Sequence, residues 1–275
     1  MITNRTYGMD PDVISYNARI IAGGNQSLSM QSLRQLNQFV ISIKKMNLWN
    51  KMICWPMKSS QNAGTGTVVY SLGGLPVYNG AFSNSPEWTP YGVDTLDSTN
   101  NRGVQIDNLP TLLIANRFSI MVVSRGLEPT QAGGAWGHNA FAWNSTGGTQ
   151  NGPNFRAKDF TGGGNFAIQK SSTAVSTSIT NTIDYSSFHS AFVTSDGSTG
   201  FGIIDGFYSA TSTSLVAGAL TATNPLYFGR RGAASGNPRC LVSFGAVFFD
   251  IDLRNNINSI NNLYKSTLGE GLALP

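Results

Sequence analysis

The stretch FHSAFVTSDGSTGFGIIDGFYSA, residues 188–210, is the strongest indication of fold in this chain. Residues 188–194 alternate between two sets of side chains, which is the period of a β-strand. Residues 196–199, Asp-Gly-Ser-Thr, have the composition of a tight turn, and residues 201–205 form the strand that returns from it. Asp205-Gly206 then turns into a third run. The stretch therefore predicts three consecutive antiparallel strands joined by short turns.

Similar short runs, rich in β-branched and aromatic residues, follow one another after Pro56, and Gly, Asn, Asp, Ser or Pro bounds each of them. Strands at such spacing without intervening helices predict a mainly β chain that folds as an antiparallel sandwich. The runs are TGTVVYSLGG (65–74), GVQIDNL (103–109), RFSIMVVSRG (117–126), NFAIQKSS (165–172), HSAFVTSDG (189–197), GFGIIDG (200–206), PLYFGRR (225–231) and CLVSFGAVFFDIDL (240–253).

Residues 10–52 have a different pattern. Asp10 and Pro11 are the residue types of a helix N-cap and a first helical position, and Gly23-Gly24 are those of a helix end. A second run of apolar residues repeats at spacings of three and four. Together the two runs predict an N-terminal helical hairpin. The residues expected on the apolar faces are Val13, Tyr16 and Ile20 in the first helix and Leu33, Leu36, Val40 and Ile43 in the second.

The apolar stripe of the second helix has two interpretations: it packs on the chain's own domain, or it docks on a neighbouring subunit. We divide the chain into residues 1–60, a helical hairpin for anchoring or assembly, and residues 61–275, the β-sandwich. The tail, residues 255–269, predicts one short closing helix. Its inward residues would be Ile257, Ile260 and Leu263.

The order of strand, Asp-Gly-Ser-Thr turn, strand, Asp-Gly and strand resembles the hairpin of laminin-G-like domains, which are concanavalin A-like jelly rolls. Further segments resemble landmarks of that family in the same order, so that the resemblance covers residues 65 to about 270. It implies an antiparallel β-sandwich of jelly-roll type. The segments are STNNRGVQI (98–106), RFSIMVVSRG (117–126), PLYFGRRG (225–232) and VSFGAVFFDIDLRNNINSINNLY (242–264).

The run LNQFVISIKKMNLWNKMICWPM, residues 36–57, is similar to virion proteins of tailed bacteriophages, in which a helical segment precedes a laminin-G-like domain. The matching pattern is apolar-Trp-x-Lys-Met at residues 48–52, although Met46-Asn47 replaces the usual Asp-Gly. The resemblance implies a structural virion protein, made in the host cytoplasm, that decorates the capsid or belongs to a tail fibre or spike. Its expected partners are other virion proteins and further copies of itself. The expected assembly residues are Leu33, Leu36, Val40, Ile43 and Trp49.

Composition excludes several other classes of protein. Charged residues make up 12% of the 275 residues, the net charge is +4, and no run of like charges marks a nucleic-acid-binding face. No apolar stretch is long enough to span a membrane, and the first residues do not have the pattern of a secretory signal. Cys54 and Cys240 lie in apolar settings and are expected to be buried free thiols. We therefore expect neither a nucleic acid nor a membrane as partner.

The sequence contains little that suggests catalysis. None of the three glutamates has a second carboxylate two to five residues away, whereas a glycosidase needs two carboxyl groups facing one sugar. Asp250 and Asp252 are the one alternating pair on an expected strand, which would place both side chains on one face. His138 and His189 are not spaced as metal ligands, and His189 is expected to be a partly exposed sheet residue. We expect a protein that is not an enzyme, with a polysaccharide-cleaving enzyme as the less favoured alternative.

The segment from residue 126 to 160 is the most site-like part of the sequence, because two tryptophans lie near amide and guanidinium donors. An apolar ring face beside such donors suits a sugar, so a host surface glycan is the alternative partner. The tryptophans could instead cover the core under this loop. The candidate glycan-binding residues are Trp136, His138, Asn139, Trp143, Asn144 and Arg156.

Calcium is the one cofactor that the sequence allows, since Ca²⁺ binds carboxylate and carbonyl oxygens in loops. The candidate ligands are Asp94, Asp196 and Asp205, although an ordinary turn explains the last two equally well.

Overall fold

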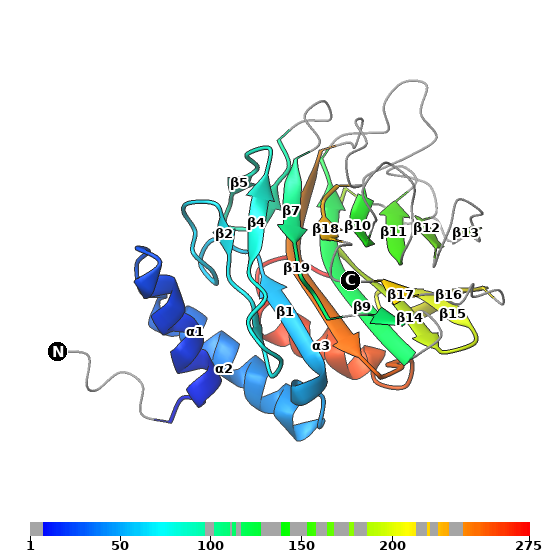
Figure 1. Ribbon diagram of the computed structural model, residues 1–275, viewed down its shortest axis with the longest axis horizontal. Coiled ribbons are helices and arrows are strands. Elements are labelled where there is room, and N and C mark those ends of the chain that lie inside the picture. The colour runs from blue at the N-terminus through cyan, green and yellow to red at the C-terminus, as the bar shows by residue number, and fades with distance from the viewer. Residues whose placement is uncertain are drawn as a thin grey trace.

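The computed structural model describes residues 8–96, 102–110, 112–113, 117–127, 139–143, 153–157, 164–167, 176–178, 186–212, 219–220, 225–230 and 239–275. Two antiparallel sheets lie face to face, and helices cover the outer face of one of them (Figure 1). The mainly β sandwich and the N-terminal helical segment expected from the sequence are both confirmed.

The stretch 188–210 folds as its pattern predicts. Strand β14 (His189–Asp196) pairs with β15 (Gly200–Ile204), which pairs with β16 (Phe207–Ser212), all antiparallel. The second turn contains Asp205 and Gly206 at φ values of 53° and 85°. Aspartate and glycine enter this left-handed region at the lowest cost, which explains their position between the strands.

Sheet A contains these three strands at one side. Beyond β14 it continues, in spatial order, with β9 (Arg117–Gly126), β19 (Cys240–Phe249), β1 (Met52–Pro56) and β3 (Leu72–Gly73). Two short strands, β6 (Val93–Asp94) and β5 (Glu87–Trp88), attach to β19 through β6.

Sheet B lies opposite sheet A. Its spatial order is β13 (Ser176–Ser178), β12 (Gly164–Ala167), β11 (Asn154–Ala157), β10 (Asn139–Trp143), β18 (Leu226–Phe228), β7 (Gly103–Ile106), β4 (Gly80–Ser83) and β2 (Val68–Val69). A separate short pair joins β8 (Leu112–Leu113) to β17 (Ala219–Leu220).

Strand β1 illustrates how sheet A is buried on both faces. Ile53 and Trp55 point into the core between the sheets, whereas Met52 and Cys54 belong to the core under the helices. A strand covered on both faces has a continuous apolar sequence and no alternation. For this reason the period-two pattern did not reveal β1, although it pairs with β19 in the middle of the sheet.

The first N-terminal helix begins where its predicted cap places it. The Asp10 carboxylate accepts a hydrogen bond from the Asp12 amide at the start of α1 (Pro11–Ala22), and α2 runs from Met30 to Lys45. The predicted hairpin extends to residue 52, but α2 stops at Lys45, and a 3₁₀ turn (Trp49–Lys51) leads into β1. The division of the chain into two parts after residue 60 stays a prediction. Strand β1 lies before this boundary in sequence but pairs with β19 of the sandwich.

The apolar stripe of α2 is used inside the chain. Its side chains pack with those of α1, α3 (Ile257–Ser266) and sheet A in one core, and Phe39 lies edge-on to Phe244 with 5.8 Å between ring centroids. This is the first of the two interpretations of the stripe. The predicted assembly role of these side chains is therefore corrected: they are buried inside the chain, and a buried side chain cannot contact a neighbouring subunit. The residues concerned are Leu33, Leu36, Val40, Ile43 and Trp49, none more than 6% exposed.

The closing helix α3 presents the predicted residues, Ile257, Ile260 and Leu263, to the same core. The segment after it is held by Lys58, whose Nζ donates to the carbonyl oxygens of Leu268 and Glu270 at 3.0 and 2.8 Å. Burial lowers the pKa of this lysine, and the Glu270 carboxylate partly opposes that shift.

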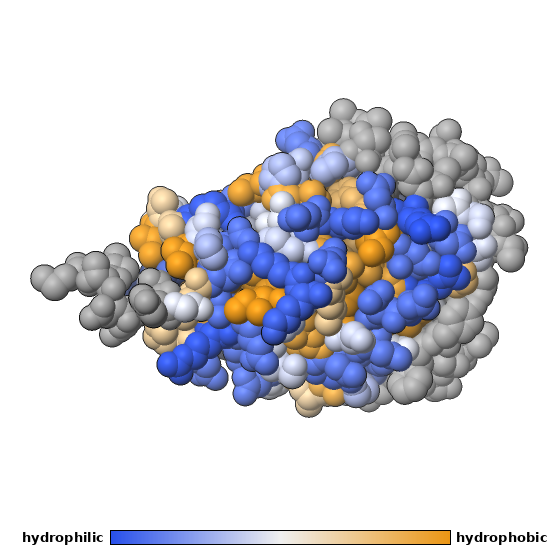
Figure 2. Space-filling model, turned by 90° about the horizontal axis from the view of Figure 1, so that it is seen from below, coloured by the Kyte–Doolittle hydropathy of each residue, from blue (hydrophilic) through white to orange (hydrophobic). Residues whose placement is uncertain are grey.

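Both cysteines are free and buried, as the sequence predicts. Burial raises the pKa of each thiol, that of Cys240 to about 12, so that neither ionises near neutral pH. The helical face of the molecule is largely hydrophilic, and apolar side chains appear on it as separate small areas (Figure 2). Among the described residues, no helix combines the length and apolar character needed to cross a membrane.

Candidate functional site

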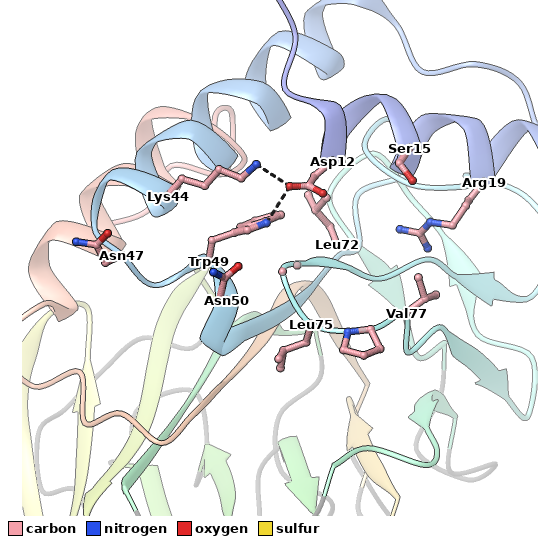
Figure 3. A pocket seen from close by; sticks show the side chains of 13 residues that line it. Asp12, Ser15, Arg19, Lys44, Asn47, Trp49, Asn50, Leu72, Leu75 and Val77 are labelled. Carbon is pink, nitrogen blue, oxygen red and sulfur yellow. Dashed lines mark hydrogen bonds and ion pairs between the residues drawn. The ribbon is translucent and has the colours of Figure 1, made fainter.

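A pocket of about 650 Å³ opens beside the helical layer (Figure 3). Three segments distant in sequence form it: α1, the end of α2 with the following 3₁₀ turn, and the loop between β3 and β4. The lining residues are Asp12, Ser15, Arg19, Lys44, Asn47, Trp49, Asn50, Leu72, Gly73, Gly74, Leu75, Pro76 and Val77.

Asp12 organises the helical wall of the pocket. Its Oδ2 atom accepts hydrogen bonds from Lys44 Nζ at 2.6 Å and from Trp49 Nε1 at 2.9 Å (Figure 3). Lys44 also bonds Asp10, and its ammonium lies 5.4 Å from the centroid of the Trp49 ring. Partial burial opposes the charge on Lys44, but its hydrogen bonds to Asp10 and Asp12 prevail and raise its pKa. Lys44 thus links the start of α1 to the end of α2 through both aspartates.

Arg19 lies further along α1 in the same wall. Its Nη2 donates to the Ser71 carbonyl at 2.6 Å and its Nη1 to Asn79 Oδ1 at 3.3 Å. Burial lowers the pKa of Arg19, and its interactions with Tyr16 and Tyr70 offset part of that effect. The guanidinium is thereby fixed between α1 and the β3–β4 loop.

The loop wall of the pocket is apolar. Leu75, Pro76 and Val77 form it, and Val77 is 54% exposed. The loop can approach the 3₁₀ turn because residue 74 is glycine: a Cβ there would lie 2.4 Å from the Trp49 carbonyl oxygen. A polar wall of charges and amides thus faces an apolar wall across the pocket.

This set of groups is suited to binding. Asp12 is the single carboxylate among the described lining residues, and its Oδ2 atom accepts from two donors. Asn47 and Asn50 are exposed amides at the rim, able to donate and accept hydrogen bonds. Acid–base catalysis of glycoside cleavage needs a second carboxyl group across the sugar. The described lining does not supply one.

A second pocket, of about 540 Å³, lies between the α1–α2 loop and residues 59–65. Its lining is mainly hydroxyl and amide groups, without a charged side chain among the residues described there.

Of the residues predicted to bind a glycan, Trp143 is the one whose side chain the structure describes. Trp143 is fully buried in the core between the sheets, and its ring is edge-on to Phe249 with 6.5 Å between centroids. The prediction that Trp143 contacts a sugar is therefore corrected. Trp143 is a core residue, which was the alternative interpretation. Asn139 and Arg156 are paired in register on β10 and β11. Trp136, His138 and Asn144 lie outside the described residues.

The three calcium candidates each have protein partners. Both carboxylate oxygens of Asp94 accept from Arg239, at 2.9 and 2.6 Å. Asp205 bonds His189 Nδ1 at 2.6 Å and the Ser190 amide at 2.9 Å. Among the residues described, no three His, Cys, Asp or Glu side chains gather as a metal site. His189 was expected to be partly exposed, but it is 8% exposed, because Asp205 draws it into this buried pair.

Asp196, the third candidate, closes the first hairpin turn. Its Oδ1 accepts from the Ser198 and Thr199 amides, and its Oδ2 from Arg254 at 3.0 Å. Partial burial opposes ionisation of Asp196, but these hydrogen bonds and the Arg254 charge outweigh it and lower its pKa to about 2. A turn residue with this function explains the motif without an ion. A bound Ca²⁺ stays a prediction.

The lowered pKa of Asp196 predicts an acid-sensitive contribution to stability. In the unfolded chain an aspartate ionises with a pKa of about 3.9. The ionised side chain therefore stabilises the fold fully above about pH 4, and this contribution is lost as the pH falls toward 2. We expect Asp196→Asn to be less stable than the wild type at pH 7, with the difference shrinking toward pH 2. Urea unfolding across this range measures it.

The matched control for this experiment is Asp250→Asn, because Asp250 is exposed and its φ of 56° suits asparagine equally well. The expectation for Asp196 is wrong if both variants show the same dependence of unfolding free energy on pH.

The alternating pair Asp250 and Asp252 does not lie on a strand as expected. Strand β19 ends at Phe249, and Asp250 occupies an exposed bend. Asp252 bonds Arg254 at 2.6 Å and Thr194 at 3.0 Å. The expected shared strand face is therefore wrong, and Asp252 serves to hold the segment after β19 against β14.

Sequence reasoning missed the residues that line the 650 Å³ pocket, apart from Trp49, which it assigned to assembly. The Asp12 carboxylate and the Trp49 indole are 37 residues apart, and the apolar-Trp-x-Lys-Met pattern that contains Trp49 does not point to Asp12. The one local signal was the acidic residue in the first turn of α1. That position is common for helix stability alone and does not indicate a site.

No protein-family model and no curated protein sequence matches the chain. Solved structures do resemble it in fold. The binding domain of botulinum neurotoxin serotype D aligns with a TM-score of 0.56 at 10% identity, covering 78% of this chain and 52% of that one. A mutant of Trypanosoma rangeli sialidase with trans-sialidase activity aligns with a TM-score of 0.58 at 12% identity, covering 86% and 40%.

A structure of botulinum neurotoxin type C, a toxin whose cell entry depends upon interaction with two ganglioside molecules, aligns with a TM-score of 0.54 at 13% identity. It covers 79% of this chain and 52% of its own. The chain thus spans about half the length of such neighbours or less. At these identities the likeness concerns the fold. The chain has a jelly-roll β-sandwich fold similar to that of these structures, among them a toxin binding domain.

Proposed function

We propose that this chain is a non-enzymatic, carbohydrate-binding β-sandwich and that it works as a structural component of a tailed-bacteriophage virion. The observation that carries the binding function is the pocket in which an apolar loop faces a wall of fixed charges and amides. Sugars present both a face of C–H groups and a rim of hydroxyl groups. The 75–77 loop would pack against the C–H face, and Asp12, Ser15 and Asn50 would form hydrogen bonds with the hydroxyl groups.

Two further observations support this function. The fold resembles that of the binding domain of botulinum neurotoxin serotype D and that of botulinum neurotoxin type C, whose cell entry depends upon two ganglioside molecules. The virion setting is supported by the resemblance of residues 36–57 to phage virion proteins and by the low charge content of the chain. Residues that form the pocket, Trp49 and Asn50, lie inside that same segment. The proposed function therefore assigns this segment both to the fold and to the binding site.

Ser15→Trp tests the pocket. Ser15 is exposed on α1 and points toward the cavity (Figure 3), so that an indole there would fill the space without removing a buried group. We expect purified full-length protein to bind members of a glycan array saturably and the variant to bind them at least about tenfold more weakly, a loss of about 1.4 kcal/mol.

The control is Ser259→Trp, which places the same indole on an exposed position of α3. Thermal unfolding establishes that both variants fold. Glycan binding that survives Ser15→Trp would contradict the assignment of the pocket. Absence of binding by the folded wild type would leave the sandwich as a structural part of the virion.

A further inference from the structure

Arg125, on strand β9, has an unusual environment for a cation. Its guanidinium carbon lies 5.1 Å from the centroid of the Phe188 ring and 5.8 Å from that of Tyr91. Its Nε atom is buried and has no hydrogen-bond partner. Within the described part of the chain, the structure gives Arg125 these two ring contacts and no anionic partner. A buried polar atom without a partner is rare in a native structure and calls for a physical explanation.

The two aromatic rings hold the guanidinium in one position. Phe188 is 3% exposed and anchors one contact in the core, whereas Tyr91 is 50% exposed and presents its ring to solvent. Stacked guanidinium groups of this kind are oriented in advance, and their parallel N–H groups match a carboxylate. Of the three nitrogens of Arg125, Nε is the one cut off from solvent without a partner, which leaves the terminal pair for a ligand.

The local charges favour an anion. Asp94 and Arg125 pair with the same residue of β19, Leu241, from its two sides. Both carboxylate oxygens of Asp94 are already taken by Arg239. Asp94 therefore does not neutralise Arg125, and the positive charge beside Tyr91 is available.

We propose that Arg125 and Tyr91 form a second binding site, for the carboxylate of an acidic sugar such as a sialic or uronic acid. The terminal nitrogens of Arg125 bond the carboxylate, and the exposed Tyr91 ring packs against the C–H face of the sugar. This site lies at the opposite end of β19 from the 650 Å³ pocket that Ser15 lines. Arg125 is in register with Leu241 near the start of β19, whereas Met52, at the start of β1 beside the pocket, is in register with Phe248 near its end. The proposal does not depend on sugar binding at that pocket.

Titration of the full chain with N-acetylneuraminic acid, glucuronic acid, glucose and inorganic phosphate, followed by calorimetry or NMR, tests this site. We expect both acidic sugars to bind, and Arg125→Gln to weaken that binding at least about tenfold. Arg125→Lys keeps the positive charge but lacks the two parallel N–H donors of the guanidinium group, and we expect it to bind the acidic sugars little better than Arg125→Gln does. Arg117→Gln, an exposed position on the same strand, is the matched control and should bind like the wild type.

Tyr91→Ala provides an independent test if Arg125→Gln fails to fold, because Tyr91 is half exposed and contributes little to the core. It too should weaken binding of the acidic sugars. The proposal is overturned if neither acidic sugar binds, if binding is unchanged in the folded variants, or if phosphate or glucose binds as strongly. Ser15→Trp should leave this binding intact, which separates the failure of one site from that of the other.

Discussion

Replacing Trp55 with alanine is expected to destabilise the fold by about 4 kcal/mol, the range found for large aromatic residues removed from protein cores. Trp55 is fully buried on β1, with its ring centroid 5.6 Å from that of Phe228 on the facing sheet. Its Nε1 also donates to the Tyr78 carbonyl at 2.8 Å, so that the variant leaves both a cavity and an unpaired acceptor. Urea unfolding followed by circular dichroism measures the loss.

Two comparisons sharpen this experiment. Trp55→Phe retains most of the apolar volume and should lose clearly less stability than Trp55→Ala. Tyr91→Ala removes a half-exposed aromatic ring and should change the unfolding free energy little. A loss below about 1 kcal/mol for Trp55→Ala would contradict the position of β1 in the middle of the sandwich.

Gly245→Ala is expected to cost about 3 kcal/mol, which is large for the addition of one methyl group. Gly245 lies on β19 where the Phe228 ring packs against the strand. A Cβ at this position would lie 2.3, 2.5 and 2.8 Å from three atoms of that ring. The ring cannot move away freely, because it is itself fully buried against Trp55. The same unfolding measurement, made on the variant and the wild type, gives the cost.

A double mutant tests whether the collision with Phe228 is what destabilises Gly245→Ala. Phe228→Leu alone creates a cavity and is destabilising, but in combination with Gly245→Ala the smaller side chain makes room for the added methyl group. We expect the double mutant to be more stable than the sum of the two single effects predicts, with a coupling of about 1 kcal/mol or more. Simple additivity of the two losses would show that the methyl group does not collide with this ring.

The elements that form because of local sequence signals were predictable. The hairpin 188–210 combines a period of two with residues that accept left-handed φ values at its turns. Helix α1 begins at the Asp10-Pro11 cap and α3 shows three apolar residues at helical spacing. Each of these signals acts over a few residues, through backbone preference and the separation of apolar from polar faces.

The elements that depend on what covers them were not predictable in this way. Strand β1 lacks alternation because it is buried on both faces, and this depends on the helices and on sheet B, which come from elsewhere in the chain. The sequence left both a solvent-facing and a core position open for Trp143, and in the structure it is buried and packs against Phe249.

Patterns of neighbouring residues were enough to predict the class of fold, several of the short strands and the cap of α1. Which side chains line the pocket and which surround Arg125 depends on how distant segments pack. The tertiary structure pairs Asp12 with Lys44 and Trp49, it places the 75–77 loop opposite them, and it stacks Arg125 between Tyr91 and Phe188. The physical reason is that such contacts arise from the packing of segments far apart in sequence, which no local pattern of residues encodes.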